Sequence, residues 1–167
     1  MARRRVWSAL AALALAGCAG APGSGGASPP PVVLSTPDGE LELAPWTYCW
    51  SGVGSSACAD GAPPEDPASV GSPDAVAFGF AKPGWQFQAT FTEVTDAACP
   101  RSLTTAAVAL TDTAFRLEPV GPAGLWTVDL FGWGPGGDVV TTFAWTTTAL
   151  GPIEPAVQTG LAVLANH

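Results

Sequence analysis

The fold is decided by the stretch Trp85-Gln86-Phe87-Gln88-Ala89-Thr90-Phe91-Thr92. Apolar and polar side chains alternate along it, and a period of two is typical of a strand with one buried face and one solvated face. The same alternation recurs at Trp126, Val128 and Leu130, which Thr127 and Asp129 separate. Residues 139–148 are rich in β-branched and aromatic side chains, which favours another strand.

Shorter apolar runs surround these strands. Residues 75–80 and 114–118 each predict a strand, and residues 41–50 predict one or two. Residues 102–110 contain the alanines of a helix and the threonines and valine of a strand, and β-propensity favours the strand. Proline and glycine end each run, as at 63–64, 83–84, 121–124, 134–137 and 151–152. Roughly seven short strands in one domain predict an all-β antiparallel β-sandwich over residues 32–150.

One of these strands resembles a strand of a known family. Gly124-Leu125-Trp126-Thr127-Val128-Asp129-Leu130 resembles the Gly-x-aromatic-x-Val-x-Leu strand that is common in bacterial immunoglobulin-like domains. The resemblance implies an immunoglobulin-like sandwich. Trp126 departs from the family pattern, in which tyrosine is more common and makes a corner hydrogen bond.

The last residues, 151–167, follow this domain as a tail. Residues 161–164 (Leu-Ala-Val-Leu) have the composition of one more strand. Two interpretations are open: an edge strand that pairs back onto the sandwich, or the first strand of a second domain that this sequence does not contain.

The first residues predict a secretory signal. Arg3, Arg4 and Arg5 precede an apolar run, and small residues follow it. The run is too short to span a membrane, which takes about 20 apolar residues. Residues 15–18 (Leu-Ala-Gly-Cys) resemble the lipobox of bacterial lipoproteins. The resemblance implies that a signal peptide of residues 1–17 is removed and that Cys18 is acylated, with palmitate as an expected lipid.

The residues after Cys18 predict a tether. Residues 18–31 are rich in glycine, serine and proline and have no apolar periodicity, which is typical of a spacer. Loss of the signal would take the formal charge from −8 to −11, because three of the six basic residues lie in it. So acidic a domain repels phosphate backbones, so we expect no nucleic-acid binding. It also lacks a basic patch for lipid headgroups, so we expect its membrane attachment to depend on the lipid.

Most of the region beyond the signal resembles uncharacterised envelope lipoproteins of high-GC actinobacteria. The resemblance rests on four segments: Glu42-Leu43-x-x-Trp46-x-Tyr48-Cys49-Trp50, Cys58-Ala59-Asp60-Gly61, Val70-Gly71-Ser72-Pro73 and Gly84-Trp85. That group has no assigned activity. It implies a membrane location at the extracytoplasmic face and says nothing about chemistry.

Three cysteines remain beyond the lipid site. Cys49 and Cys58 flank a Gly-Ser-rich turn, so we predict that they form a disulfide and staple a hairpin, as an exported protein permits. A pairing that uses Cys99 is the alternative, because connectivity does not follow from spacing. An unpaired Cys99 is interpreted as a buried small apolar residue, with a redox or intermolecular site as the other reading.

The residues needed for catalysis or metal binding are scarce. The only histidine, His167, is the last residue, so neither a serine–histidine hydrolase nor a histidine metal site is expected. Asp60, Glu65 and Asp66 lie in an acidic, proline-rich stretch that lacks the ligand spacing of a calcium loop. We therefore expect no enzyme activity, no metal and no cofactor.

Tryptophans are the remaining candidates for binding. Trp85, Trp126 and Trp145 lie in alternating strands and predict core positions. Trp50 and Trp133 stand beside glycine-rich turns, where an exposed indole can stack on a sugar or anchor a protein interface. The sequence thus predicts a lipid-anchored, non-catalytic binding or structural module with an envelope protein or cell-wall partner. A carbohydrate-binding module that uses Trp50 and Trp133 is the alternative.

Overall fold

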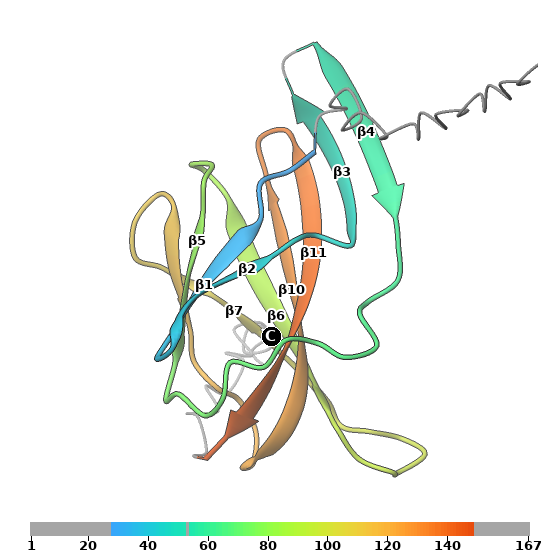
Figure 1. The fold of residues 1–167 in the computed structure, drawn as a ribbon, viewed down its shortest axis with the longest axis vertical. Coiled ribbons are helices and arrows are strands. Elements are labelled where there is room, and N and C mark those ends of the chain that lie inside the picture. Colours follow the sequence, from blue (N-terminus) through green and yellow to red (C-terminus); the bar gives the residue numbers. More distant parts are fainter. Residues whose placement is uncertain (1–27, 53, 149–167) are drawn as a thin grey trace, which may run out of the picture.

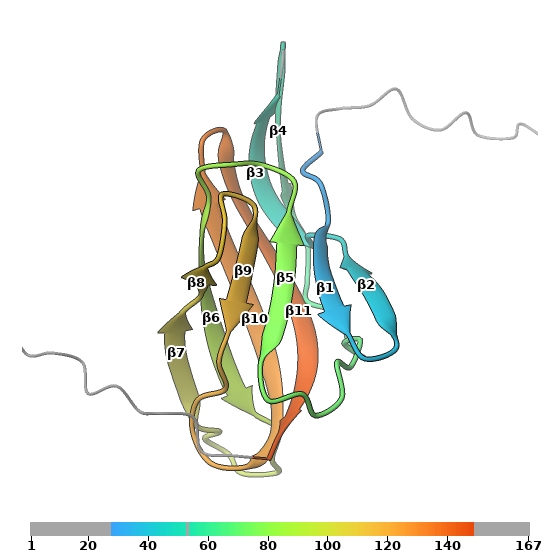
Figure 2. The same cartoon turned by 90° about the vertical axis from the view of Figure 1, so that its left-hand side faces the viewer.

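Two antiparallel sheets packed face to face form the domain, as Figures 1 and 2 show. The structure is a computed structural model that describes residues 28–52 and 54–148. No helix occurs in these two ranges. The predicted all-β antiparallel sandwich is therefore confirmed. The signal peptide, Cys18, most of the tether and the 151–167 tail lie outside the described residues.

The first sheet has five strands in the order β2-β1-β5-β9-β8. Their bounds are β1 Val32–Thr36, β2 Gly39–Leu43, β5 Val76–Phe80, β8 Val108–Ala109 and β9 Ala114–Leu117. The second sheet has six strands in the order β4-β3-β11-β10-β6-β7. Their bounds are β3 Thr47–Gly52, β4 Ser55–Asp60, β6 Gln86–Glu93, β7 Ser102–Ala106, β10 Gly124–Gly134 and β11 Gly137–Thr147.

The strands with the clearest alternation lie at the centre of the six-stranded sheet. β10 pairs with β11 on one side and with β6 on the other, so its register joins Trp126 to Trp145 and to Glu93. Residues 102–110 are strand, as predicted, but they belong to both sheets. β7 pairs with β6 and β8 pairs with β9, so the chain crosses between the layers at Ala107.

The core fills the space between the inward faces of the two sheets. Trp85, Trp126 and Trp145 are buried in it, which confirms their predicted positions. The indole N–H of Trp126 donates to Thr147 Oγ1 at 3.1 Å, and that of Trp145 donates to the Pro73 carbonyl at 3.1 Å. Trp126 and Trp145 thus keep their apolar surface in the core while their indole N–H groups are satisfied. The indole nitrogen of Trp85 is buried and has no hydrogen-bond partner among the described residues.

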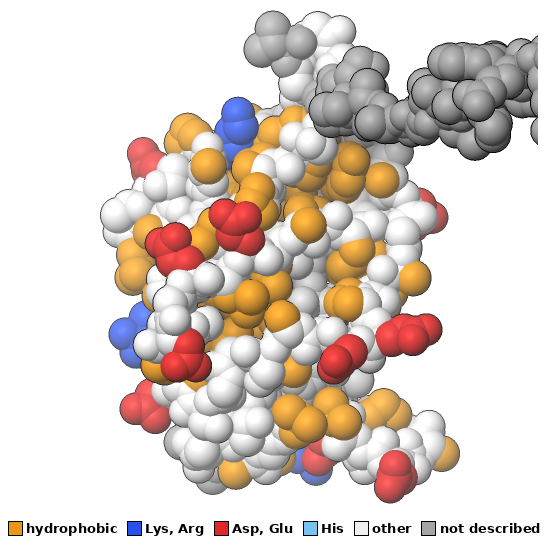
Figure 3. Space-filling model, viewed as in Figure 1, with side chains coloured by type: hydrophobic (Ala, Val, Ile, Leu, Met, Phe, Trp, Pro, Cys, Tyr) orange, Lys and Arg blue, Asp and Glu red, His pale blue; other side chains and the backbone are white. Residues whose placement is uncertain are grey.

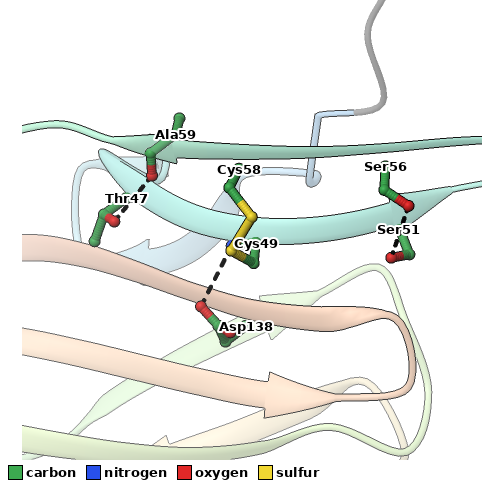
Figure 4. Close-up of a disulfide and its surroundings, with 7 residues drawn as sticks. All are labelled: Thr47, Cys49, Ser51, Ser56, Cys58, Ala59 and Asp138. Atoms are coloured by element: carbon green, nitrogen blue, oxygen red, sulfur yellow. Dashed lines mark hydrogen bonds between the residues drawn. A yellow bond between two sulfur atoms is a disulfide. The ribbon is translucent and has the colours of Figure 1, made fainter.

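The β3–β4 hairpin extends beyond the rest of the sandwich in both ribbon views (Figures 1 and 2). Cys49 and Cys58 are directly opposite each other in its ladder and form a disulfide, which confirms the predicted pairing (Figure 4). Asp138 of β11 accepts a hydrogen bond from the backbone N–H of Cys49 at 3.3 Å. The disulfide and this bond together tie the hairpin to the sheet.

Removal of the disulfide with Cys49→Ser/Cys58→Ser is expected to loosen this hairpin. Cys49 and Cys58 are nine positions apart, and closing so short a loop is worth about 2–3 kcal/mol in the chain-entropy model. β4 pairs with the sheet only through β3, so loss of the disulfide should mainly lower the free energy needed to open the hairpin. Hydrogen exchange of the β4 amides measures it. Cys99→Ser is the control, and equal β4 protection in both variants would refute the stabilising role.

Candidate functional site

Trp50, expected to be exposed, is instead part of the core. Only 7% of its surface is accessible, and its ring lies 5.6 Å from that of Trp85 and 6.4 Å from that of Phe80. The reason is alternation along β3: Cys49 points outward to its disulfide, so Trp50 must point inward. The prediction that Trp50 offers an exposed binding ring is therefore wrong.

Trp133 lies on the outer face of the six-stranded sheet. It is partly buried, and its ring stacks on that of Phe131 with centroids 5.4 Å apart and planes at 22°. Phe131 is 40% exposed. Both residues stand at outward positions of β10, because Trp126, Val128 and Leu130 occupy the inward ones. We call this pair, Phe131 and Trp133, the aromatic pair.

Polar side chains surround the aromatic pair. The register places Gln86 and Asp138 opposite Trp133, and Gln88 opposite Phe131. Both glutamines are exposed, and within the described ranges neither side chain makes a hydrogen bond to the protein. An apolar centre with polar groups at its rim is the general arrangement of a protein-binding surface.

A groove of about 350 Å³ opens at the edge of the same sheet. Its walls are the β2–β3 connection, which includes Trp46, and the segment after β4, which passes in front of β11 in Figure 1. Thr141 and Thr142 of β11 line its floor. Two carboxylates, those of Glu42 and Asp66, stand at its walls. We call this feature the edge groove.

Hydrogen bonds link the edge groove to the outer face of the sheet. Trp46 Nε1–H donates to Thr142 Oγ1 at 2.9 Å, and the Thr142 hydroxyl donates to Asp129 Oδ1 at 2.6 Å. Thr142 is only 3% exposed although it occupies an outward position, because the groove walls cover it. This chain fixes the orientation of the Trp46 indole.

Cys99 lies in the exposed segment between β6 and β7 and is not disulfide-bonded. The interpretation as a buried apolar residue is therefore wrong, and its thiol is open to solvent. The predicted acidic stretch is exposed as well, with Asp60, Glu65 and Asp66 all at the surface. Of the three, only Asp66 lines the edge groove.

Titratable side chains do not gather into a metal-binding cluster in the part of the chain described. No group of three or more histidine, cysteine, aspartate or glutamate side chains that could hold a metal occurs in residues 28–52 and 54–148. In Figure 3 the acidic side chains are scattered over the visible face, and the basic ones lie at its margins. Within the described residues Arg116 and Glu118 form an ion pair, which is exposed.

Comparisons of this chain with family models, curated proteins and solved structures found no match. Among the described residues, no helix is long and apolar enough to cross a membrane.

The sequence reasoning missed Phe131 and most of the edge groove. The outward position of Phe131 could have been predicted from the sequence. Trp126, Val128 and Leu130 alternate as inward residues, which implies that Phe131 points outward with Trp133. The burial of Thr142 could not have been predicted in this way, because it depends on segments that are distant in sequence. Cys18, the predicted lipid site, lies outside the described residues.

Proposed function

We propose that this chain is a lipid-anchored, non-catalytic binding module on the extracytoplasmic face of the cell membrane. A lipid on Cys18 holds it there, and residues 19–31 separate the sandwich from the bilayer. The domain contacts an envelope partner through the aromatic pair. The single observation that carries the binding role is the stacking of the exposed Phe131 ring on the partly buried Trp133 ring at one sheet face.

The anchor is supported by the residues of the N-terminus. The basic, apolar and small-residue segments are in the order of a secretory signal, and the lipobox-like Leu15-Ala16-Gly17-Cys18 ends it. The body beyond it is acidic, so the protein itself offers little attraction to anionic lipid headgroups. Firm attachment would therefore depend on acyl chains, and more than one is needed for stable anchoring.

The binding role is supported by the energetics of the aromatic pair. Large aromatic rings are costly to leave in water, and tryptophan is enriched among residues that dominate binding energy. The two rings support each other by stacking, so little side-chain freedom is lost when a partner covers them. The neighbouring glutamines and Asp138 can hydrogen-bond at the rim.

Truncation of the aromatic pair is expected to weaken envelope binding strongly. The test uses the chain in which a plain, cleaved secretory signal replaces residues 1–18, added to washed cell envelopes, so that neither the lipid nor an uncut signal contributes to retention. Phe131→Ala/Trp133→Ala should lower the retained fraction at least tenfold, because a central aromatic contributes about 2 kcal/mol or more. Val108→Ala is the matched control, since Val108 is 57% exposed in the other sheet. Equal retention of both variants would contradict the proposed surface.

A carbohydrate partner is the second candidate for the same surface. It is favoured by the exposed amides of Gln86 and Gln88 beside the aromatic pair, because amides can hydrogen-bond to sugar hydroxyls while a ring packs on the apolar face of a sugar. Trp50 is no longer part of this candidate, since it is buried. Release of the bound domain by soluble cell-wall polysaccharide would favour the glycan over a protein partner.

A further inference from the structure

The edge of β11 has a gap at the floor of the edge groove. The β3 ladder along β11 ends with the pair Val140 and Thr47, and pairing on that edge resumes only at Ala144, with Ala68 and Val70. Between these points Thr142 has no strand partner on this edge among the described residues.

The missing partner leaves main-chain polar groups directed at the edge groove. Val140 and Ala144 use their backbone groups on this edge, and backbone groups alternate sides along a strand. Thr142 lies two positions from each, so its N–H and C=O point to the same edge. A carbonyl at the base of a groove is an acceptor that a ligand donor can reach.

The charge of the edge groove is wholly negative. Glu42 and Asp66 line it, and no lysine, arginine or histidine does. Neither carboxylate takes part in an ion pair within the described residues. A cationic partner would therefore gain attraction from both carboxylates and meet no opposing charge.

Trp46 gives the edge groove an aromatic wall in a fixed orientation. Its indole N–H donates a hydrogen bond to Thr142 Oγ1, and the Thr142 hydroxyl in turn donates one to Asp129. A cation over an indole face is attracted by the ring, more so than over phenylalanine or tyrosine. The aromatic wall favours an organic cation with an apolar stem over a bare metal ion. A calcium ion would also need six or more oxygen ligands, and no group of three or more metal-binding side chains occurs in the described residues.

We propose that the edge groove binds a primary ammonium group on an aliphatic stem, carried by a lysine side chain or by a free amine. The ammonium group donates hydrogen bonds to the Thr142 carbonyl and to the carboxylates of Glu42 and Asp66. The stem packs along the Trp46 ring. The volume of about 350 Å³ is at the small end of ligand sites, which suits one side chain or a small amine.

The test is an NMR titration of the Cys18→Ser chain, with the Trp46 indole N–H as the reporter and Trp46→Phe to assign it. The probes are n-butylammonium, n-butanol and butyrate at equal ionic strength, followed by lysine capped at both ends of its backbone. We expect a saturable shift with n-butylammonium and none with the other two four-carbon probes. A tighter constant for capped lysine identifies a protein side chain as the source, and an equal or weaker one identifies a free amine.

Charge-neutral variants separate this site from the general acidity of the domain. Glu42→Gln/Asp66→Asn should weaken n-butylammonium binding on the order of fivefold, as expected for two exposed ion pairs. Asp38→Asn/Asp112→Asn removes the same charge away from the groove lining and should leave binding within twofold. Equal weakening by the two double variants, or equal shifts with butanol and butylammonium, would overturn the proposal. The aromatic pair is intact in every variant, so failure here leaves the proposed envelope binding standing.

Discussion

Trp126→Ala is expected to destabilise the domain by about 3–5 kcal/mol, a large part of the stability of an ordinary domain. Trp126 is fully buried at the centre of the six-stranded sheet, and its ring contacts that of Phe91 edge-on with centroids 6.2 Å apart. The truncation leaves a cavity between the sheets and removes the hydrogen bond to Thr147. Urea unfolding followed by circular dichroism measures the loss as a lower midpoint at an unchanged slope.

The matched control for this variant is Phe131→Ala in the same strand. Phe131 points to the outer face, so its truncation opens no cavity and should change the free energy of unfolding by less than about 1 kcal/mol. Similar losses for the two variants would show that β10 does not divide its side chains between core and surface as described.

Cys18→Ser is expected to move the protein from the membrane fraction to the soluble fraction. Serine lacks the thiol that would carry the proposed lipid, and the acidic sequence that follows has no run of basic residues to replace the anchor. A second variant, in which a plain secretory signal replaces residues 1–18, covers the case in which the uncut signal itself stays in the bilayer. Immunoblots of both fractions measure the distribution.

The control for the anchor is Cys99→Ser. Cys99 is the cysteine of the described residues that forms no disulfide, and it is exposed. This variant should remain in the membrane fraction like the parent protein. Membrane retention of the plain-signal variant would contradict anchoring through Cys18.

The long strands could be predicted because their patterns are local. β6 and β10 each alternate over several residues, and the two faces of a half-buried strand produce that pattern directly. The short strand β1 carries less of a pattern, with five residues of which two are fully buried, and it was not predicted as an element of its own. The division of residues 102–110 between two sheets depends on pairing with distant strands, which no local pattern contains.

The candidate sites divide in the same way. The disulfide was predictable because two cysteines flank a turn, and once it is placed, alternation alone buries Trp50. The outward position of Phe131 also follows from alternation. The edge groove does not, because Glu42, Asp66 and Thr142 come together only through the connections between the layers. The edge groove could not be predicted from the sequence because it forms where segments distant in sequence come into contact.

In the proposed function, a lipid on Cys18 holds this domain at the envelope. Mass spectrometry of the N-terminal peptide from the membrane-purified protein tests it most directly. We expect a chain that begins at Cys18 and carries the added mass of its acyl chains. A chain that begins at another residue, or an unmodified Cys18 in the membrane-bound protein, would rule out this lipid anchor.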